Sequence, residues 1–139
     1  MEKEYNLENF KSETQVSETA AVYYARSGMK PTIFIDLSFL SGFTKEELAQ
    51  YFNITSKTIL RYLNSGKTLD PFTSEHAMAL KNLYLVGAEV FENLDYFRSW
   101  LKKPNYGLGN MVPQELMKTP GGLRLVKEEI LRIEYGATA

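Results

Sequence analysis

The sequence predicts an all-α fold, and three observations support this prediction. Capped helices with apolar stripes can be placed along most of the chain from Phe43 onward, and the connections between them are short. Residues 32–40 have a strand-like composition, but no partner strand is evident downstream. With 139 residues, of which 44% are hydrophobic, the chain can bury a real core. We therefore expect helices packed on helices.

The composition argues against several classes of protein. The chain has no cysteine, which excludes disulfides and thiolate metal sites, and we expect neither a metal nor a cofactor. No segment has the apolar length of a membrane span, and the N-terminus is polar and acidic, so we expect a cytoplasmic protein without a membrane partner. A formal net charge of −1 argues against indiscriminate coating of nucleic acid, although cations can still cluster on one face.

The pattern along the chain divides it into three regions. Residues 1–30 are rich in glutamate and poor in large aliphatic side chains, so we expect a flexible or loosely docked leader. Residues 31–70 are expected to form a helix-turn-helix module, in which residues 36–40 form a short first helix. Residues 71–139 are expected to form a second, small helical domain.

The clearest local pattern is a pair of capped helices within residues 43–66. Thr44 and Glu47 form a capping box that starts the first helix. Asn53 tolerates the left-handed conformation that a sharp interhelical turn requires, and Thr55 can cap the second helix. Two capped helices with so short a connection predict a helix-turn-helix. Its expected core consists of Leu48, Phe52, Ile54, Ile59 and Leu63, with Ala49 where the helices approach each other.

The second of these helices carries side chains typical of a DNA recognition helix. From Thr55 to Leu69 there are three cations and no anion, and short hydroxyl groups lie near the helix start. A recognition helix presents its N-terminal half to the major groove. Helix-turn-helix units also serve as plain packing modules, so both interpretations stay open. The candidate DNA-binding residues are Thr55, Ser56, Lys57, Thr58, Arg61 and Lys67.

Residues 70–103 are predicted to form much of the protein core. We predict helices over residues 75–91 and 95–101, with Trp100 as the large anchor of the second. His76 is the only histidine, and no nucleophile, nucleotide-binding glycine loop or facing carboxylate pair accompanies it, so we predict a structural role and no enzymatic activity. The residues expected to be buried are Leu80, Leu83, Tyr84, Val90 and Phe91.

The last predicted helix has both ends marked in the sequence. Thr119 is a good N-cap, and Pro120 occupies the first helical position, where its missing N–H costs nothing. Gly136 is expected to close the helix in a left-handed conformation. We expect this terminal helix to dock onto a partner. Its apolar stripe consists of Leu123, Val126, Ile130 and Ile133.

Several motifs in the second half of the chain resemble a known domain. They are W-L-K-K-P-N over residues 100–105, L-G-N-M-V-P-Q-E-L-M-K-T over 108–119, the following glycine pair, and the terminal R-I-E-Y-G. Together they resemble the toxin-binding domain of the Xre/MbcA/ParS-type antitoxins, which carry a helix-turn-helix upstream. The resemblance covers about residues 43–136. Asn110 stands where the family usually has a second glycine, and Phe97 and Arg98 stand near a customary alanine.

The resemblance implies a specific function. Such antitoxins pair with a RES-domain toxin that degrades NAD⁺, and they block it by placing their C-terminal region over its active-site cleft. The helix-turn-helix binds operator DNA, so that the complex represses its own operon as a homodimer or a higher toxin–antitoxin assembly. The alternative is a stand-alone dimeric helix-turn-helix transcriptional regulator whose C-terminal region only dimerises.

The resemblance and the terminal helix together nominate residues for toxin binding. Arg132 can pair with an acidic group, Glu134 with cationic side chains of the toxin, and Tyr135 can supply a buried aromatic anchor. Each of them can equally form a salt bridge within its own helix or pack on the core. The candidate toxin-binding residues are Arg124, Arg132, Glu134, Tyr135 and Gly136.

Overall fold

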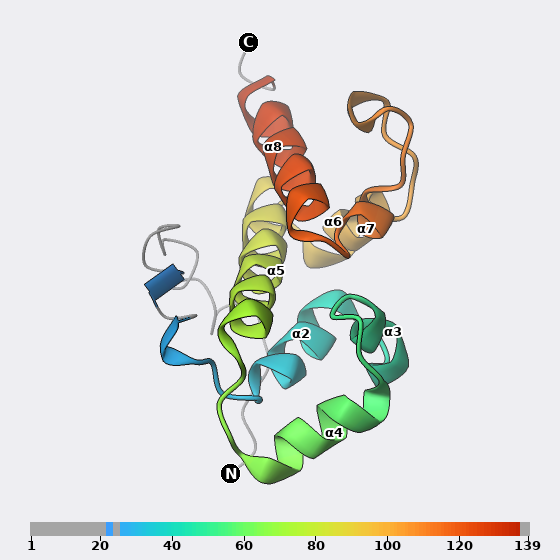
Figure 1. Ribbon diagram of the computed structural model, residues 1–139. Helices are drawn as coiled ribbons and strands as arrows, with labels where there is room; N and C mark the ends of the chain where they lie inside the picture. The colour runs from blue at the N-terminus through green and yellow to red at the C-terminus, as the bar shows by residue number, and fades with distance from the viewer. Residues whose placement is uncertain (1–21, 24–25, 137–139) are drawn as a thin grey trace. The chain divides into compact units, whose positions relative to one another are not determined.

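The computed structural model describes residues 22–23 and 26–136, and this part of the chain is built from helices (Figure 1). The elements are α2 (Ile33–Ser41), α3 (Lys45–Gln50), α4 (Ser56–Ser65), α5 (Pro71–Val90), α6 (Leu94–Leu101), the 3₁₀ helix η2 (Tyr106–Leu108), α7 (Pro113–Leu116) and α8 (Pro120–Gly136). None of the described residues lies in a named strand, and the all-α prediction is confirmed. The expected leader, residues 1–30, lies mostly outside the described residues.

Two compact units make up the chain, and each is described by itself. The first extends to Leu85 and the second begins at Val86, so the division falls inside α5. Across the described residues, no helix is both long and apolar enough to span a lipid bilayer.

Residues 32–40, whose composition is strand-like, lie almost entirely in helix α2. It begins at Ile33 rather than at Asp36, so the predicted helix is correct in type but too short. A turn starts it directly after Pro31, because the N–H of Ile33 donates to the carbonyl of Lys30 at 3.1 Å. Most of its apolar side chains are buried along one broad face of the helix, and this burial outweighs the β-propensity of the sequence.

The two helices of the predicted helix-turn-helix begin where their caps predict. Thr44 Oγ1 accepts from the N–H of Glu47 at 3.1 Å, and Glu47 Oε1 accepts from the N–H of Thr44 at 3.1 Å, which completes the capping box. Asn53 has a left-handed φ of 54° in the turn. Thr55 Oγ1 then accepts from the N–H of Thr58 at 3.2 Å and caps α4. Helix α3 packs on α4 and on α2.

The core of the first unit draws more on α2 than the sequence indicated. Of the five residues expected to form the helix-turn-helix core, Leu48 and Ile59 are buried, whereas the other three are only partly buried. Phe34 of α2 is buried and meets Phe52 edge-on, with ring centroids 5.2 Å apart. It also stacks on Tyr62 of α4 at 6.3 Å. Helix α2 therefore contributes to the same core as α3 and α4.

The first part of α5 is held to the preceding residues of this unit by polar and aromatic contacts. Lys81 Nζ lies 3.2 Å from Asp36 Oδ2 of α2, and both side chains are largely buried. His76 is buried and its ring meets Phe52 edge-on at 5.3 Å. Both contacts fix the first part of α5 against residues from the preceding helices.

In the second unit, Phe97 rather than Trp100 is the fully buried anchor of α6. Trp100 is only partly buried and stacks on Phe97 with ring centroids 6.1 Å apart. Gly87 makes room for the Phe97 ring, because a Cβ at Gly87 would overlap it. This close approach of helix α5 leaves space for the large Phe97 side chain in the core. Val90 and Phe91, which were expected to be buried, are only partly buried.

Helix α8 starts as predicted and ends differently. Thr119 Oγ1 accepts from the N–H of Gly122 at 3.1 Å, and Pro120 is the first helical residue. The apolar seam, defined as Leu123, Val126, Ile130 and Ile133, is buried at its first three positions and partly buried at the last. The prediction of a left-handed Gly136 is wrong, since the chain is still helical there and its φ is not positive.

The glycine pair at the start of α8 predicts opposite effects for two neighbouring substitutions. A Cβ at Gly122 would overlap the backbone carbonyl oxygen of Leu116, whereas a Cβ at Gly121 would meet nothing within 4 Å. We expect Gly122→Ala to lower the free energy of unfolding by about 1–3 kcal/mol through overpacking. We expect Gly121→Ala to cause no loss, because alanine favours the helix over glycine. Urea denaturation of both variants measures the difference, and equal stability would contradict this close approach.

The cap of α5 predicts a pH dependence. Asp70 Oδ2 accepts from the N–H of Thr73 at 3.1 Å. Partial burial raises the pKa of Asp70, but hydrogen bonds from Thr73 and from nearby backbone N–H groups outweigh burial and hold the pKa below its ordinary 3.8. A carboxyl with a lowered folded-state pKa stabilises the fold above its unfolded-state pKa, and this contribution is lost as the pH falls through the folded-state value.

Asp70→Asn keeps an acceptor at this cap and removes its titration. We expect the stability of the wild type relative to Asp70→Asn to shrink as the pH falls below about 4, near the unfolded-state pKa. Urea denaturation of both proteins between neutral and acidic pH gives this difference. A difference that does not change with pH would show that the Asp70 carboxylate does not contribute to stability in this way.

Candidate functional site

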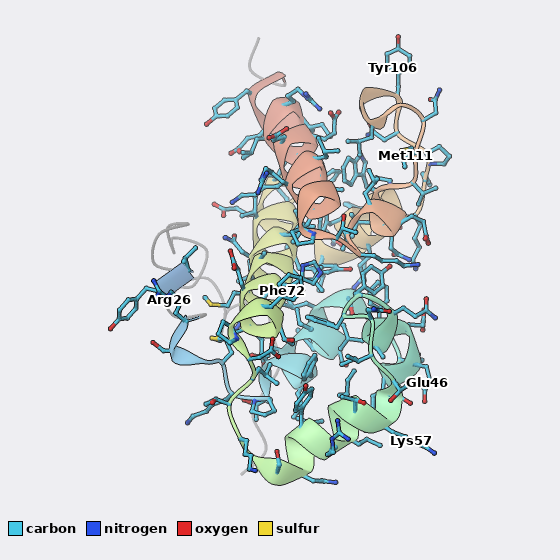
Figure 2. All side chains as sticks on the ribbon, in the orientation of Figure 1. Arg26, Glu46, Lys57, Phe72, Tyr106 and Met111 are labelled. Carbon is cyan, nitrogen blue, oxygen red and sulfur yellow. The ribbon has the colours of Figure 1, made fainter. Side chains whose placement is uncertain are left out.

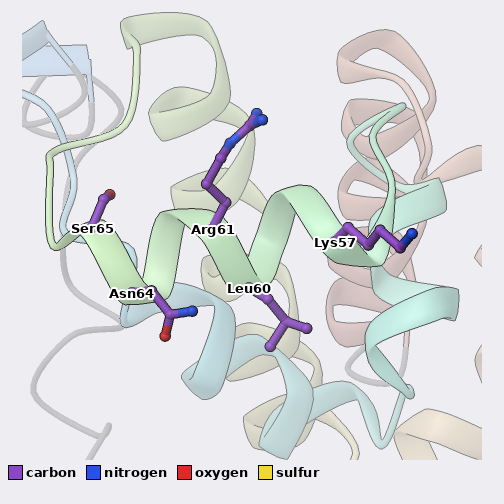
Figure 3. A pocket seen from close by; sticks show the side chains of 5 residues that line it. All are labelled: Lys57, Leu60, Arg61, Asn64 and Ser65. Carbon is purple, nitrogen blue, oxygen red and sulfur yellow. The ribbon is translucent and has the colours of Figure 1, made fainter.

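The outer face of α4 is the first candidate surface. Lys57, Leu60, Arg61 and Asn64 recur at helical spacings of three and four residues, which places them on one face. All four are exposed, while Ile59 on the opposite side is buried. Together with Ser65 they line a depression in the surface (Figure 3). The face is therefore accessible along most of the helix.

The structure brings only some of the sequence-predicted DNA-binding residues onto this face. Lys57 and Arg61 belong to it, and Lys67 is exposed just beyond the helix end. Thr55 is engaged in capping, and its hydroxyl also lies 3.0 Å from that of Thr58. Ser56 and Thr58 are partly buried. The cations are thus better placed for a ligand than the hydroxyl groups.

Leu60 and Asn64 also lie on this surface, but neither was predicted from the sequence as a DNA-binding residue. They follow Lys57 by three and seven residues, so helical periodicity alone could have identified them. Leu60 is 41% exposed although its face is otherwise polar. Asparagine can bond the adenine edge and an apolar side chain can contact the thymine methyl group, so both types suit the major groove.

The charge distribution around α4 favours an anionic ligand. Lys57, Arg61 and Lys67 are all exposed, and no acidic residue occurs between Thr55 and Leu69. Because like charges add over a short surface, this face has a positive potential although the whole chain carries a net charge of −1.

The second candidate surface is the exposed face of α8. Arg124, Glu128, Arg132 and Tyr135 recur every three or four residues and are exposed, on the side of the helix opposite the buried seam. We call these four residues the outer strip. Leu125 lies next to it and is 49% exposed. Three of the five predicted toxin-binding residues, Arg124, Arg132 and Tyr135, therefore share one face.

Arg132 has a structural contact as well as an exposed side chain. Its Nε donates to Oε2 of Glu129 at 2.9 Å, and its terminal nitrogen pairs with the same oxygen. The Glu129 carboxylate is buried and lies against Gly107 of η2, where a Cβ would overlap it. The Arg132 side chain nevertheless keeps 61% of its surface exposed. Removing this arginine would disturb the fold as well as the surface.

Glu134 and Gly136 do not share the position of the outer strip. Neighbouring helical residues point about 100° apart, so Glu134 lies to one side of Tyr135. Both Glu134 and Gly136 are exposed, and nothing lies within 4 Å of a Cβ built on Gly136. The last turn of α8 is thus open on more than one side.

The described residues contain no group of three or more histidine, aspartate or glutamate side chains arranged to hold a metal ion. The exposed face of α4 carries cations and one amide, and the outer strip of α8 carries arginine, glutamate and tyrosine. Their chemistry suits recognition of a large partner through many weak contacts.

A comparison with protein families gives a match within the second unit. Residues 87–136 match the family model described as the antitoxin Xre/MbcA/ParS C-terminal toxin-binding domain. The match spans α6, η2, α7 and α8. A comparison with curated proteins gave no match.

The match confirms the resemblance seen in the sequence. The second unit is similar to a toxin-binding domain over residues 87–136. This similarity to the C-terminal domain of the Xre/MbcA/ParS-type antitoxins supports an antitoxin role and implies a toxin as the partner.

Proposed function

We propose that this protein neutralises a RES-domain, NAD⁺-degrading toxin by covering its active-site cleft with the end of α8, and that it represses its own operon by binding operator DNA through α4. The family match over residues 87–136 is the observation that carries the antitoxin role. The identity of the toxin rests on the resemblance of the motifs, and operator binding rests on the helix-turn-helix and its charge. Because an NAD⁺-degrading enzyme and operator DNA both lie in the cytoplasm, we propose that the protein acts there.

The toxin-binding part of the proposal uses the outer strip and not the apolar seam. Leu123, Val126 and Ile130 are buried within the protein's own fold, and α8 contacts α7 and η2. Freeing the seam would expose this apolar surface to water before it could enter another cleft, at about 25 cal/mol per Å². The exposed arginines can pair with carboxylates of the toxin, and Tyr135, which is 70% exposed, can fill an apolar pocket.

The DNA-binding part of the proposal places α4 in the major groove. Lys57 and Lys67 are suited to phosphate contacts, and Arg61 lies at the centre of the exposed face, where an arginine can bond the guanine edge. Helix-turn-helix proteins bind as dimers to half-sites about one helical turn apart. We therefore propose a homodimer on the operator, alone or within a larger toxin–antitoxin assembly.

One pair of arginine substitutions separates the two activities. Arg61 and Arg124 are both exposed, the first on α4 and the second on α8. We expect Arg61→Ala to weaken binding to the DNA upstream of its own operon by about 1–3 kcal/mol and to leave toxin neutralisation unchanged. We expect Arg124→Ala to weaken toxin binding only. Fluorescence anisotropy with labelled DNA and the rescue of growth from a co-expressed RES-domain protein give the two readouts.

The outcomes of this pair are distinct for each hypothesis. If neither variant nor the wild type rescues growth while all bind DNA, the protein is a stand-alone regulator and the proposed toxin is wrong. If the wild type rescues growth but binds no DNA, the helix-turn-helix is only a packing module. Arg124 is the better probe of the toxin surface than Arg132, since Arg132 also pairs with the buried Glu129.

A truncation tests whether the end of α8 is needed for inhibition. Ending the chain after Ile133 removes Glu134, Tyr135 and all later residues but retains the complete seam. We expect this variant to fold and to bind operator DNA as the wild type does, and to lose the rescue of growth from the RES-domain toxin. Circular dichroism checks folding, and Tyr135→Phe, which retains the ring, serves as the control. Full rescue by the truncated protein would contradict the proposed covering of the cleft.

A further inference from the structure

Tyr106 is the most exposed large hydrophobic side chain in the described part of the protein, with 90% of its surface accessible. It begins η2, inside the toxin-binding unit, and Figure 2 shows its ring at the tip of a loop, pointing into solvent. Exposed apolar residues are common singly, so exposure alone does not define a binding site. Two further features, the conformation of the loop and its connection to α8, support a binding role for this side chain.

The loop over residues 105–111 has a fixed conformation. The N–H of Asn105 donates to the carbonyl of Met111 at 3.0 Å, and the N–H of Asn110 donates to the carbonyl of Asn105 at 2.8 Å. Gly109 and Asn110 both have left-handed φ values, of 66° and 64°. Asparagine tolerates this conformation better than most residues, which explains how it replaces the usual second glycine. The backbone around Tyr106 is therefore closed by its own hydrogen bonds.

The same loop is attached to α8. Gly107, the residue after Tyr106, lies against the buried carboxylate of Glu129, which in turn binds Arg132 of the outer strip. Leu108 is buried, and η2 contacts α8. Tyr106 thus belongs to a loop that is joined to α8 at Glu129 and Arg132, within the part of α8 that precedes its end.

We propose that Tyr106 is a second anchor for the toxin, seated in an apolar pocket of the toxin that is rimmed by acidic groups. This inference rests on the proposed function, because it assigns the same partner to a surface outside α8. Residues 104–112 carry no charge, and the exposed Lys102 and Lys103 precede them directly in the sequence. A tyrosine on an uncharged loop that follows two exposed cations is complementary to an apolar pocket with an acidic rim.

The fixed loop makes Tyr106 an efficient anchor. Binding normally costs free energy for ordering side chains and loops, and a loop that is already ordered avoids much of this cost. A tyrosine has a large apolar ring and few rotatable bonds, and it carries a hydroxyl that can find a polar partner at the edge of a pocket. The toxin then contacts the antitoxin at two places, the end of α8 and the tip of this loop.

The test measures the binding of full-length variants to a purified RES-domain toxin. We expect Tyr106→Ala to weaken the affinity at least about tenfold, as for a hot-spot aromatic residue, and Tyr106→Phe to retain most of the affinity because it keeps the ring. Phe72→Ala is the matched control, since Phe72 is 71% exposed but lies in the first unit. Calorimetry gives the affinities, and circular dichroism verifies that each variant folds.

The possible outcomes distinguish the proposed second anchor from the proposed function. Equal affinity for Tyr106→Ala and the wild type would overturn the second anchor and leave the proposed function intact. A wild type that does not bind the RES-domain protein would overturn the proposed function itself. If Tyr106→Ala changes the mass in light scattering but not the toxin affinity, the loop contacts a second copy of this chain, and the inference is wrong.

Discussion

Burial of the α8 seam is the constraint on which the rest of the second unit depends. Leu123, Val126 and Ile130 are buried, and the close approach of Gly122 to the carbonyl of Leu116 fixes where the helix starts. Once these side chains are buried, helical periodicity determines which other side chains of α8 face solvent. The outer strip and the loop at Tyr106 therefore stay accessible to a partner while the seam remains buried.

The two candidate surfaces have different chemistry and belong to different units. The face on α4 is cationic, with no acidic residue from Thr55 to Leu69, whereas the outer strip on α8 alternates basic, acidic and aromatic side chains. The first suits the uniform negative charge of a nucleic-acid backbone. The second suits a protein surface, where arginine and tyrosine contribute most of the binding energy. Substitutions on one surface can therefore be interpreted without reference to the other.

Local features of the sequence predicted the helix starts well. The capping box at Thr44, the cap at Thr55, the left-handed Asn53 and the Thr119 cap are all confirmed, because each depends on residues only a few positions apart. The helical type of residues 36–40 was also predicted, from the lack of a partner strand. The all-α fold follows from these elements together.

Features that depend on distant residues were not predictable in this way. The choice of Phe97 over Trp100 as the buried anchor depends on the space that Gly87 leaves, ten residues earlier on another helix. The burial of Glu129, which makes Arg132 partly structural, depends on Gly107 in a separate loop. Leu60 and Asn64, by contrast, were overlooked although helical periodicity counted from Lys57 places them on the exposed face of α4.

The central claim is that α8 keeps its seam buried while its outer strip binds the toxin. Methionine oxidation in the complex with the RES-domain protein tests it directly, because Met117 is fully buried at the end of α7 and Met111 is 51% exposed in the same unit. The account predicts that Met117 resists oxidation equally in the free and bound protein, while Met111 of the free protein is oxidised readily. Rapid oxidation of Met117 in the complex would show that α8 leaves its own fold to enter the cleft, and would contradict the account.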